Sequence, residues 1–94
     1  MLLKNLIKNI SKDKKNIIIS GLSLNSNQIK KNYIFFAIRG NKGNGEKFIN
    51  DAIKKGASVI ICSKKCKISS KKILIIKKSD VRKFLSEIAS KFYK

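Results

Sequence analysis

Three short apolar runs set the strongest constraint on how this chain can fold. They are YIFFAI at residues 33–38, ASVIIC at 57–62 and ILII at 73–76. Short runs rich in β-branched and aromatic residues, apolar on both faces, are typical of strands buried in a parallel sheet. A helical pattern separates the first two runs, and another follows the third. The sequence therefore predicts an α/β domain, with a small mixed, mostly parallel sheet flanked by helices.

Two further elements are predicted near the N-terminus. Apolar residues between positions 2 and 10 follow helical spacing, which indicates a short amphipathic helix. IIIS at 17–20 has the composition of a short strand, stopped by Gly21. Residues 21–32 carry many hydroxyls and amides without a long apolar run, so we expect an ordered loop there.

A helix is predicted between the first two apolar runs. Phe48, Ile49, Ala52 and Ile53 share one helical face. Gly56 stands where a glycine commonly ends a helix.

The last third of the chain is predicted to hold a basic loop, the ILII strand and a final helix. The loop is SKKCKISSKK at residues 63–72. Ser79 is a suitable N-cap for a helix that starts at Asp80, whose carboxylate suits a first turn. The apolar stripe of this helix comprises Val81, Leu85, Ile88, Ala89 and Phe92.

The net charge has two competing explanations. The chain has 94 residues, which is one domain at most, and 23 Lys and Arg against 5 Asp and Glu give a formal charge of +18. Such a balance is typical of proteins that bind polyanions. However, only Arg39 and Arg82 are arginines, the lysines are spread along the whole chain, and Lys, Ile and Asn make up half of it. An AT-rich coding bias would produce the same composition without selection for a polyanion partner.

Few residues could carry catalysis or bind a metal. The chain has no histidine, and its two cysteines, Cys62 and Cys66, cannot complete a four-ligand zinc site or a C-x-x-C redox motif. We expect two reduced thiols, no metal site and no catalytic residue. The five acids show no close pair placed for acid–base work. These acids are Asp13, Glu46, Asp51, Asp80 and Glu87.

A cytoplasmic, soluble chain is expected. No apolar run approaches the ~20 residues that a membrane-spanning helix needs. The first dozen residues lack the long apolar core and the small-residue cleavage site of a secretion signal.

A glycine-rich loop follows the first apolar run. Gly40, Gly43 and Gly45 form G-x-x-G-x-G, which matches neither the P-loop nor the dinucleotide-binding pattern. Glycines can let the backbone approach a ligand closely, and a helix start just after them would attract an anion. The pattern leaves a plain turn and a ligand loop as alternatives.

The run ISGLSLNSNQIKKNYIFFAIRGNKGNGEKFINDAIKKGASVIIC resembles the N-terminal domain of the Mur ligases. The family pattern GLS-x-DSR, LFFAL-x-G, DG and FI-x-x-AI-x-x-GA has counterparts in the same order along this chain. The ending DVRKFLSEIASKFYK is similar to the helix that leads into the family's ATP-binding domain. This KFY ending favours the branch that adds the third stem-peptide residue of peptidoglycan over its D-Ala-D-Ala-adding sister.

The resemblance implies a substrate site. In the family this domain holds the UDP part of UDP-MurNAc-L-Ala-D-Glu. By position, Leu24 would supply a backbone contact and Ser26 a hydroxyl, while Asn41, Lys42 and Gly43 would close over the nucleotide. A hydroxyl, backbone amides and a flexible cation suit uridine and diphosphate oxygens.

The resemblance also implies what this chain lacks. Residues 1–94 correspond to one domain, without the ATP-binding and C-terminal domains, so ATP and Mg²⁺ belong to the full-length enzyme and ligation is not expected here. The family's Asp-Ser-Arg is Asn25-Ser26-Asn27 in this sequence, which leaves the salt bridge or ligand contact of that arginine open. A small Lys-rich nucleic-acid-binding protein remains the alternative from another functional class.

Overall fold

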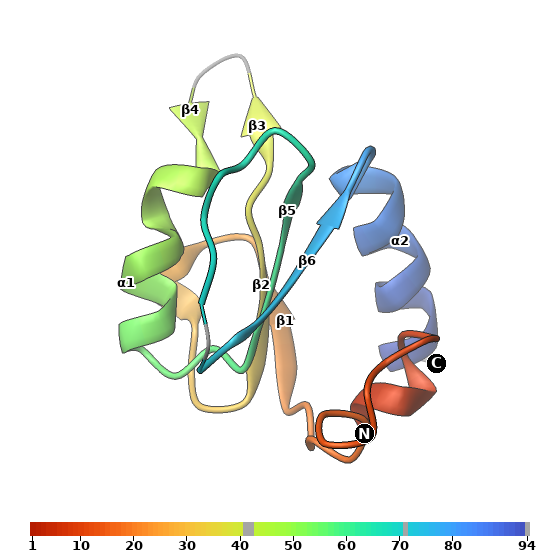
Figure 1. Ribbon diagram of the computed structural model, residues 1–94. Coiled ribbons are helices and arrows are strands. Elements are labelled where there is room, and N and C mark those ends of the chain that lie inside the picture. The colour runs from red at the N-terminus through yellow and green to blue at the C-terminus, as the bar shows by residue number, and fades with distance from the viewer. Residues whose placement is uncertain (41–42, 71, 94) are drawn as a thin grey trace.

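A four-stranded, fully parallel sheet forms the centre of the computed structural model, which describes residues 1–40, 43–70 and 72–93. The order across the sheet is β1-β2-β5-β6, with α1 on one face and α2 on the other (Figure 1). The predicted α/β fold with a mostly parallel sheet is therefore confirmed. The sheet strands are β1 (Gly21–Ser23), β2 (Tyr33–Phe36), β5 (Val59–Ser63) and β6 (Leu74–Lys78), and the helices are α1 (Ile49–Lys54) and α2 (Val81–Phe92).

Smaller elements complete the chain. A two-stranded antiparallel hairpin follows β2, and three short 3₁₀ helices precede β1, follow β1 and lead into α1. The hairpin strands are β3 (Arg39–Gly40) and β4 (Gly43–Asn44), and the 3₁₀ helices are η1 (Leu3–Asn5), η2 (Ser26–Gln28) and η3 (Gly45–Phe48).

Side chains of the central strands alternate between two apolar clusters. On β2, Ile34 and Phe36 pack with α2 and η1, whereas Phe35 packs with α1. On β5, Ile61 joins the first cluster and Ile60 the second. All five side chains are fully buried. Continuous apolar runs are therefore needed here, because both faces of a parallel sheet are covered.

The two N-terminal predictions were wrong. Only η1 is helical between residues 2 and 10, and Asn9, with a φ of 62°, does not allow a right-handed helix to reach residue 10. The predicted strand at 17–20 is absent, and Ile18 forms only an isolated bridge with Leu2. The strand begins at Gly21 instead, where an added Cβ would lie 2.4 Å from the Tyr33 ring.

The sequence predicted one helix end and one helix start, and the structure confirms the first and shifts the second by one residue. Gly56 follows α1 with a φ of 112°, so the predicted glycine stop is confirmed. The predicted N-cap of α2 was wrong by one residue: Asp80 is the cap, and its carboxylate accepts a hydrogen bond from the Lys83 N–H at 3.0 Å. The helix therefore starts at Val81 rather than Asp80.

The ILII run is less buried than predicted. Its residues Ile73, Leu74, Ile75 and Ile76 are all half-buried, while the β5 partners of the last three, Val59, Ile60 and Ile61, are fully buried. The reason is topological, since β6 is the last strand of the sheet and has a neighbour on one side only.

Candidate functional site at the carboxyl edge of the sheet

The carboxyl ends of the four parallel strands lie along one edge of the sheet. β1 pairs with β2 through Ser23 and Phe35, and β2 pairs with β5 through Phe36 and Ile61. β1 and β2 therefore end at the same edge of the sheet. Figure 1 shows the hairpin after β2 at the top of the molecule, near the N-terminus of α2, while the segment after β1 passes beside α1. Ligands of open α/β sheets bind outside this edge, so we searched it for candidate side chains.

The loop after β1, residues 24–28, is held by its own side chains. The Asn25 N–H donates to the Ser23 hydroxyl at 3.0 Å, and the Asn27 N–H donates to the Asn25 side chain at 2.9 Å. Asn25 therefore caps η2, as a serine or aspartate would. Leu24, a predicted contact residue, is 56% exposed and lies just outside this capped turn.

Ser26, the second predicted contact residue, is only 6% exposed. Its 3₁₀ helix packs against α1. Hydrogen bonds from the Lys55 ammonium and from the Ser26 hydroxyl hold the pKa of the Asp51 carboxyl below its usual range. The Ser26 hydroxyl thus lies beside Asp51, and its oxygen keeps lone pairs with which to accept a hydrogen bond.

Lys55 forms a second connection between the 24–28 loop and α1, beside the one between Ser26 and Asp51. Its ammonium forms an ion pair with Asp51 at 3.0 Å and donates to the Asn27 side chain at 3.0 Å. Asn27 stands where the family pattern has arginine, and here it accepts a hydrogen bond from a cation of α1. Sequence reasoning did not identify Asp51 or Lys55, although their spacing of four residues on a predicted helix was a signal for an ion pair.

The glycine-rich segment forms the β3–β4 hairpin and the start of η3. Gly43, a predicted contact residue, pairs with Gly40 in the hairpin. The Gly45 N–H donates to the Ile38 carbonyl at 2.9 Å, and an added Cβ at Gly45 would lie 2.9 Å from the Ile38 nitrogen. Gly45 is therefore required by close backbone packing. The predicted contacts Asn41 and Lys42 lie outside the described residues.

Glu46 ties the segment after the hairpin to the end of β5. The Ser63 hydroxyl donates to the Glu46 carboxylate at 2.8 Å, and the Ser63 N–H donates to the same oxygen at 3.4 Å. Beside Ser63 lies a cavity of about 410 Å³. It is lined by Ile38, Ser63, Lys64, Lys65, Ser79, Asp80, Val81 and Arg82. Sequence reasoning missed Glu46 and Ser63, whose only signal was their position next to a predicted strand end and a predicted loop.

The two cysteines have no disulfide. Burial and a hydrogen bond with Cys66 raise the pKa of the Cys62 thiol to about 12. A thiol with so high a pKa is a poor nucleophile at neutral pH, because little of it is thiolate. Among residues 1–40, 43–70 and 72–93, no cluster of cysteine and acidic side chains could hold a metal ion, and no helix is long and apolar enough to span a membrane.

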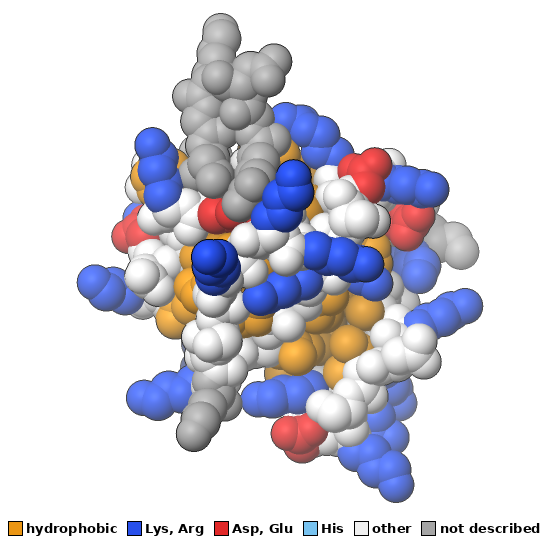
Figure 2. Space-filling model, turned by 45° about the horizontal axis from the view of Figure 1, so that its top comes forward, with side chains coloured by type: hydrophobic (Ala, Val, Ile, Leu, Met, Phe, Trp, Pro, Cys, Tyr) orange, Lys and Arg blue, Asp and Glu red, His pale blue; other side chains and the backbone are white. Residues whose placement is uncertain are grey.

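Lysine and arginine side chains are scattered over this end of the molecule. Figure 2, which brings the carboxyl edge forward, shows them on all sides of the view with apolar and polar surface between them.

Comparison with known proteins decides the family. The model of the Mur ligase family, catalytic domain, matches residues 18–93. The chain belongs to the Mur ligase family. The predicted family resemblance is thereby confirmed.

Relatives of this Mur ligase chain support the same assignment. It is 43% identical over 93 residues to the UDP-N-acetylmuramoyl-L-alanyl-D-glutamate–2,6-diaminopimelate ligase of Clostridium tetani, covering 97% of this chain and 19% of that protein. It is 37% identical over 92 residues to the UDP-N-acetylmuramyl-tripeptide synthetase of Borrelia garinii, covering 96% of this chain and 18% of that protein. The chain thus spans less than a fifth of the length of these relatives.

Solved structures agree on the fold of the Mur ligase chain. MurF ligase from Thermotoga maritima, in complex with ADP, has a TM-score of 0.65 at 27% identity and aligns with 80% of this chain and 17% of its own. MurF from Acinetobacter baumannii has a TM-score of 0.64 at 18% identity, covering 77% of this chain and 15% of its own, a likeness of fold alone.

Proposed function

We propose that residues 1–94 are the N-terminal substrate-binding domain of a peptidoglycan-synthesising Mur ligase and bind the UDP part of UDP-MurNAc-L-Ala-D-Glu. The observation that carries the proposal is that β1 and β2 are parallel neighbours, so the 24–28 loop and the β3–β4 hairpin both leave the sheet at its carboxyl edge. The names of the relatives support this substrate, since they act on UDP-N-acetylmuramoyl-L-alanyl-D-glutamate.

The proposed activity of the full-length protein is ATP-dependent addition of the third stem-peptide residue. The names of two relatives, a tripeptide synthetase and a diaminopimelate ligase, favour this branch over the D-Ala-D-Ala-adding sister. ATP and Mg²⁺ would be held by other domains. The described residues of this chain contribute binding groups to this proposal, and no catalytic group.

The binding role of each residue follows from its local geometry. The Leu24 backbone lies at an exposed position just beyond β1, where it can meet a nucleobase edge. The Ser26 oxygen, beside Asp51, can accept a hydrogen bond. Gly43 offers backbone groups in the hairpin, and Asn41 and Lys42 complete the proposed contact set.

A titration of the ¹⁵N-labelled chain with UDP-MurNAc-L-Ala-D-Glu tests the proposal. Amide signals of the 24–28 loop and of residues 43–45 should shift together, and UDP alone should reproduce most of the pattern. Ser26→Ala should weaken binding, whereas Ser90→Ala, an exposed serine of α2, is the matched control and should bind normally. Absence of shifts at millimolar ligand, with the fold intact, would contradict binding by this chain alone.

The net charge of +18 also supports a polyanion partner, which the same NMR titration tests when duplex DNA replaces the nucleotide. Duplex DNA should then bind with a steep salt dependence. Shifts spread over many lysines that vanish at physiological salt would indicate non-specific attraction. A DNA affinity that persists there and exceeds that for the nucleotide would favour the nucleic-acid alternative.

A further inference from the structure

β6 presents an open strand edge. It is the last strand of the sheet, paired in parallel with β5 from Leu74 to Lys78. No described residue pairs with the backbone of β6 on the side away from β5. Groups on that side can therefore pair with another extended chain.

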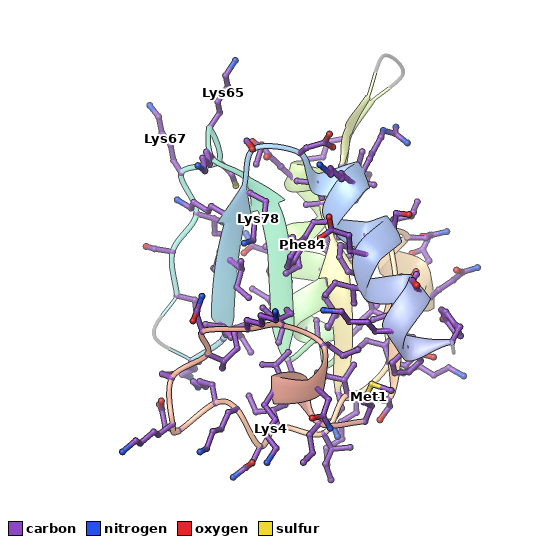
Figure 3. All side chains as sticks on the ribbon, turned by 90° about the vertical axis from the view of Figure 1, so that its right-hand side faces the viewer. Met1, Lys4, Lys65, Lys67, Lys78 and Phe84 are labelled. Carbon is purple, nitrogen blue, oxygen red and sulfur yellow. The ribbon has the colours of Figure 1, made fainter. Side chains whose placement is uncertain are left out.

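A groove runs along this edge. Its volume is about 470 Å³, and it lies between β6 and the segment that precedes it. Figure 3 shows that segment beside β6, with Lys65 and Lys67 projecting from its upper part. The lining comprises Lys14, Ile68, Ser69, Ser70, Ile73, Leu74, Ile75 and Lys77. Half-buried isoleucines form the floor of the groove, and lysines stand at its sides.

The charges around the groove select against a second copy of this chain. Two β6 edges placed together would bring Lys77 and its equivalents close to one another, and like charges on paired strands are destabilising. Lys78 is directed elsewhere, because its ammonium lies over the Phe84 ring at 4.6 Å (Figure 3). Asp13 is the acid next to Lys14 in the sequence, but its carboxylate already accepts a hydrogen bond from the Ser11 hydroxyl at 2.7 Å.

We propose that the β6 edge binds an extended acidic peptide segment, which adds to the sheet as a fifth strand. Backbone hydrogen bonds to β6 would supply affinity, as in other cases of strand addition. Ile73, Ile75 and Lys77 lie on one face of β6, because side chains of a strand alternate between faces. On the matching face of the peptide, apolar side chains would cover Ile68, Ile73 and Ile75, and an acidic side chain two residues further along would meet Lys77. A second acid at the other side of the groove would meet Lys14. This surface is separate from the proposed nucleotide site, which lies at the ends of the strands.

The probe is a short synthetic valine–glutamate peptide with two valines and then a glutamate at successive alternate positions, and threonine between them, so that the valines and the glutamate share one face of the strand. Added to the ¹⁵N-labelled chain, it should shift the amide signals of Leu74 to Lys78 and of Ile68. The same peptide N-methylated at alternate residues should lose this binding, because its backbone can no longer donate to an edge strand. A valine–lysine peptide should not bind.

Charge reversal supplies the protein-side test. Lys77→Glu should weaken the valine–glutamate peptide about three- to tenfold, since it replaces an attractive cross-strand pair with a repulsive one. Lys83→Glu, an exposed position on α2, makes the same charge change away from the groove and is the matched control. Circular dichroism of both variants establishes that the fold is retained.

Three results would overturn the proposal. Equal binding of the N-methylated peptide would exclude strand addition. Equal shifts of β6 caused by polyphosphate, which has no peptide backbone, would reduce the effect to charge attraction. Concentration-dependent β6 shifts without any peptide would assign the edge to self-association.

Discussion

Gly56→Ala is expected to destabilise the domain through the turn that joins α1 to β5. The φ of Gly56 is 112°, in a region that L-residues rarely adopt, and this strain costs about 1–3 kcal/mol. An added Cβ would also lie 2.8 Å from the Lys31 Cα and 3.0 Å from the Lys31 nitrogen. These are backbone atoms, which cannot turn away as a side chain can.

The neighbouring hydrogen bonds make this turn hard to relax. The Asn32 N–H donates to the Gly56 carbonyl at 2.9 Å, just before β2 begins. Overpacking of this kind adds about 1–3 kcal/mol, and the lower chain entropy of alanine in the unfolded state returns about 0.4–1 kcal/mol. The net loss in the free energy of unfolding should be about 2–4 kcal/mol, the middle of the range left by these three contributions.

Urea denaturation followed by circular dichroism measures this loss. Lys54→Ala, an exposed position on α1, is the control and should change stability by less than about 0.5 kcal/mol. If Gly56→Ala were as stable as the Lys54→Ala control, the claim that the turn requires a glycine would be refuted.

Three further predictions concern the helix cap, the core and a buried thiol. Asp80→Ala should cost about 1 kcal/mol in urea denaturation by removing the cap of α2, while Ser79→Ala should be nearly neutral. Phe36→Ala should cost about 3–5 kcal/mol because the ring is fully buried, whereas Phe48→Ala, at 46% exposure, should cost far less. The Cys62 thiol ionises near pH 9.0 when unfolded and near pH 12 when folded, so the unfolded state binds fewer protons between these values. Stability should therefore fall as pH rises from 9 to 12, more steeply than in Cys62→Ala. Equal slopes for the two proteins would contradict the raised pKa.

The central strands were predictable because nearly all of their side chains are apolar and become buried in the core. In YIFFAI and ASVIIC every side chain is apolar or small, and the sheet buries both faces of these strands. The glycine that ends α1 was predictable for a similar reason, since few other residues adopt its φ.

The N-terminal segment was not predictable because tertiary contacts decide its structure. IIIS has strand composition, yet residues 17–19 bond to the first residues of the chain and not to the sheet. The strand is instead GLS, which has weak strand propensity. Gly21 leaves room for the Tyr33 ring, a cross-strand contact that no local pattern reveals.

The internal bonding of the candidate site was not predictable. The family pattern alone indicated Leu24 and Ser26, and their contacts with a ligand stay a prediction. The partners Asp51 and Lys55 came to light only in three dimensions, because Lys55 and Asn27 are 28 residues apart in the chain. The loss of the family arginine at position 27 is accompanied by a hydrogen bond from Lys55, which holds the loop from the opposite side.

This bonding means that Ser26→Ala alone cannot establish a ligand contact. The alanine would remove both the hydroxyl that faces the ligand in our proposal and the hydrogen bond that fastens η2 to Asp51. Asp51→Ala separates the two, because it removes the group that accepts from Ser26 and attracts Lys55 but leaves the Ser26 hydroxyl in place. If Ser26 touches the nucleotide, Asp51→Ala should bind UDP nearly as well as the wild type, whereas Ser26→Ala should bind clearly less. If both variants lose affinity equally in the same NMR titration, Ser26 acts by positioning the loop, and the direct contact is wrong.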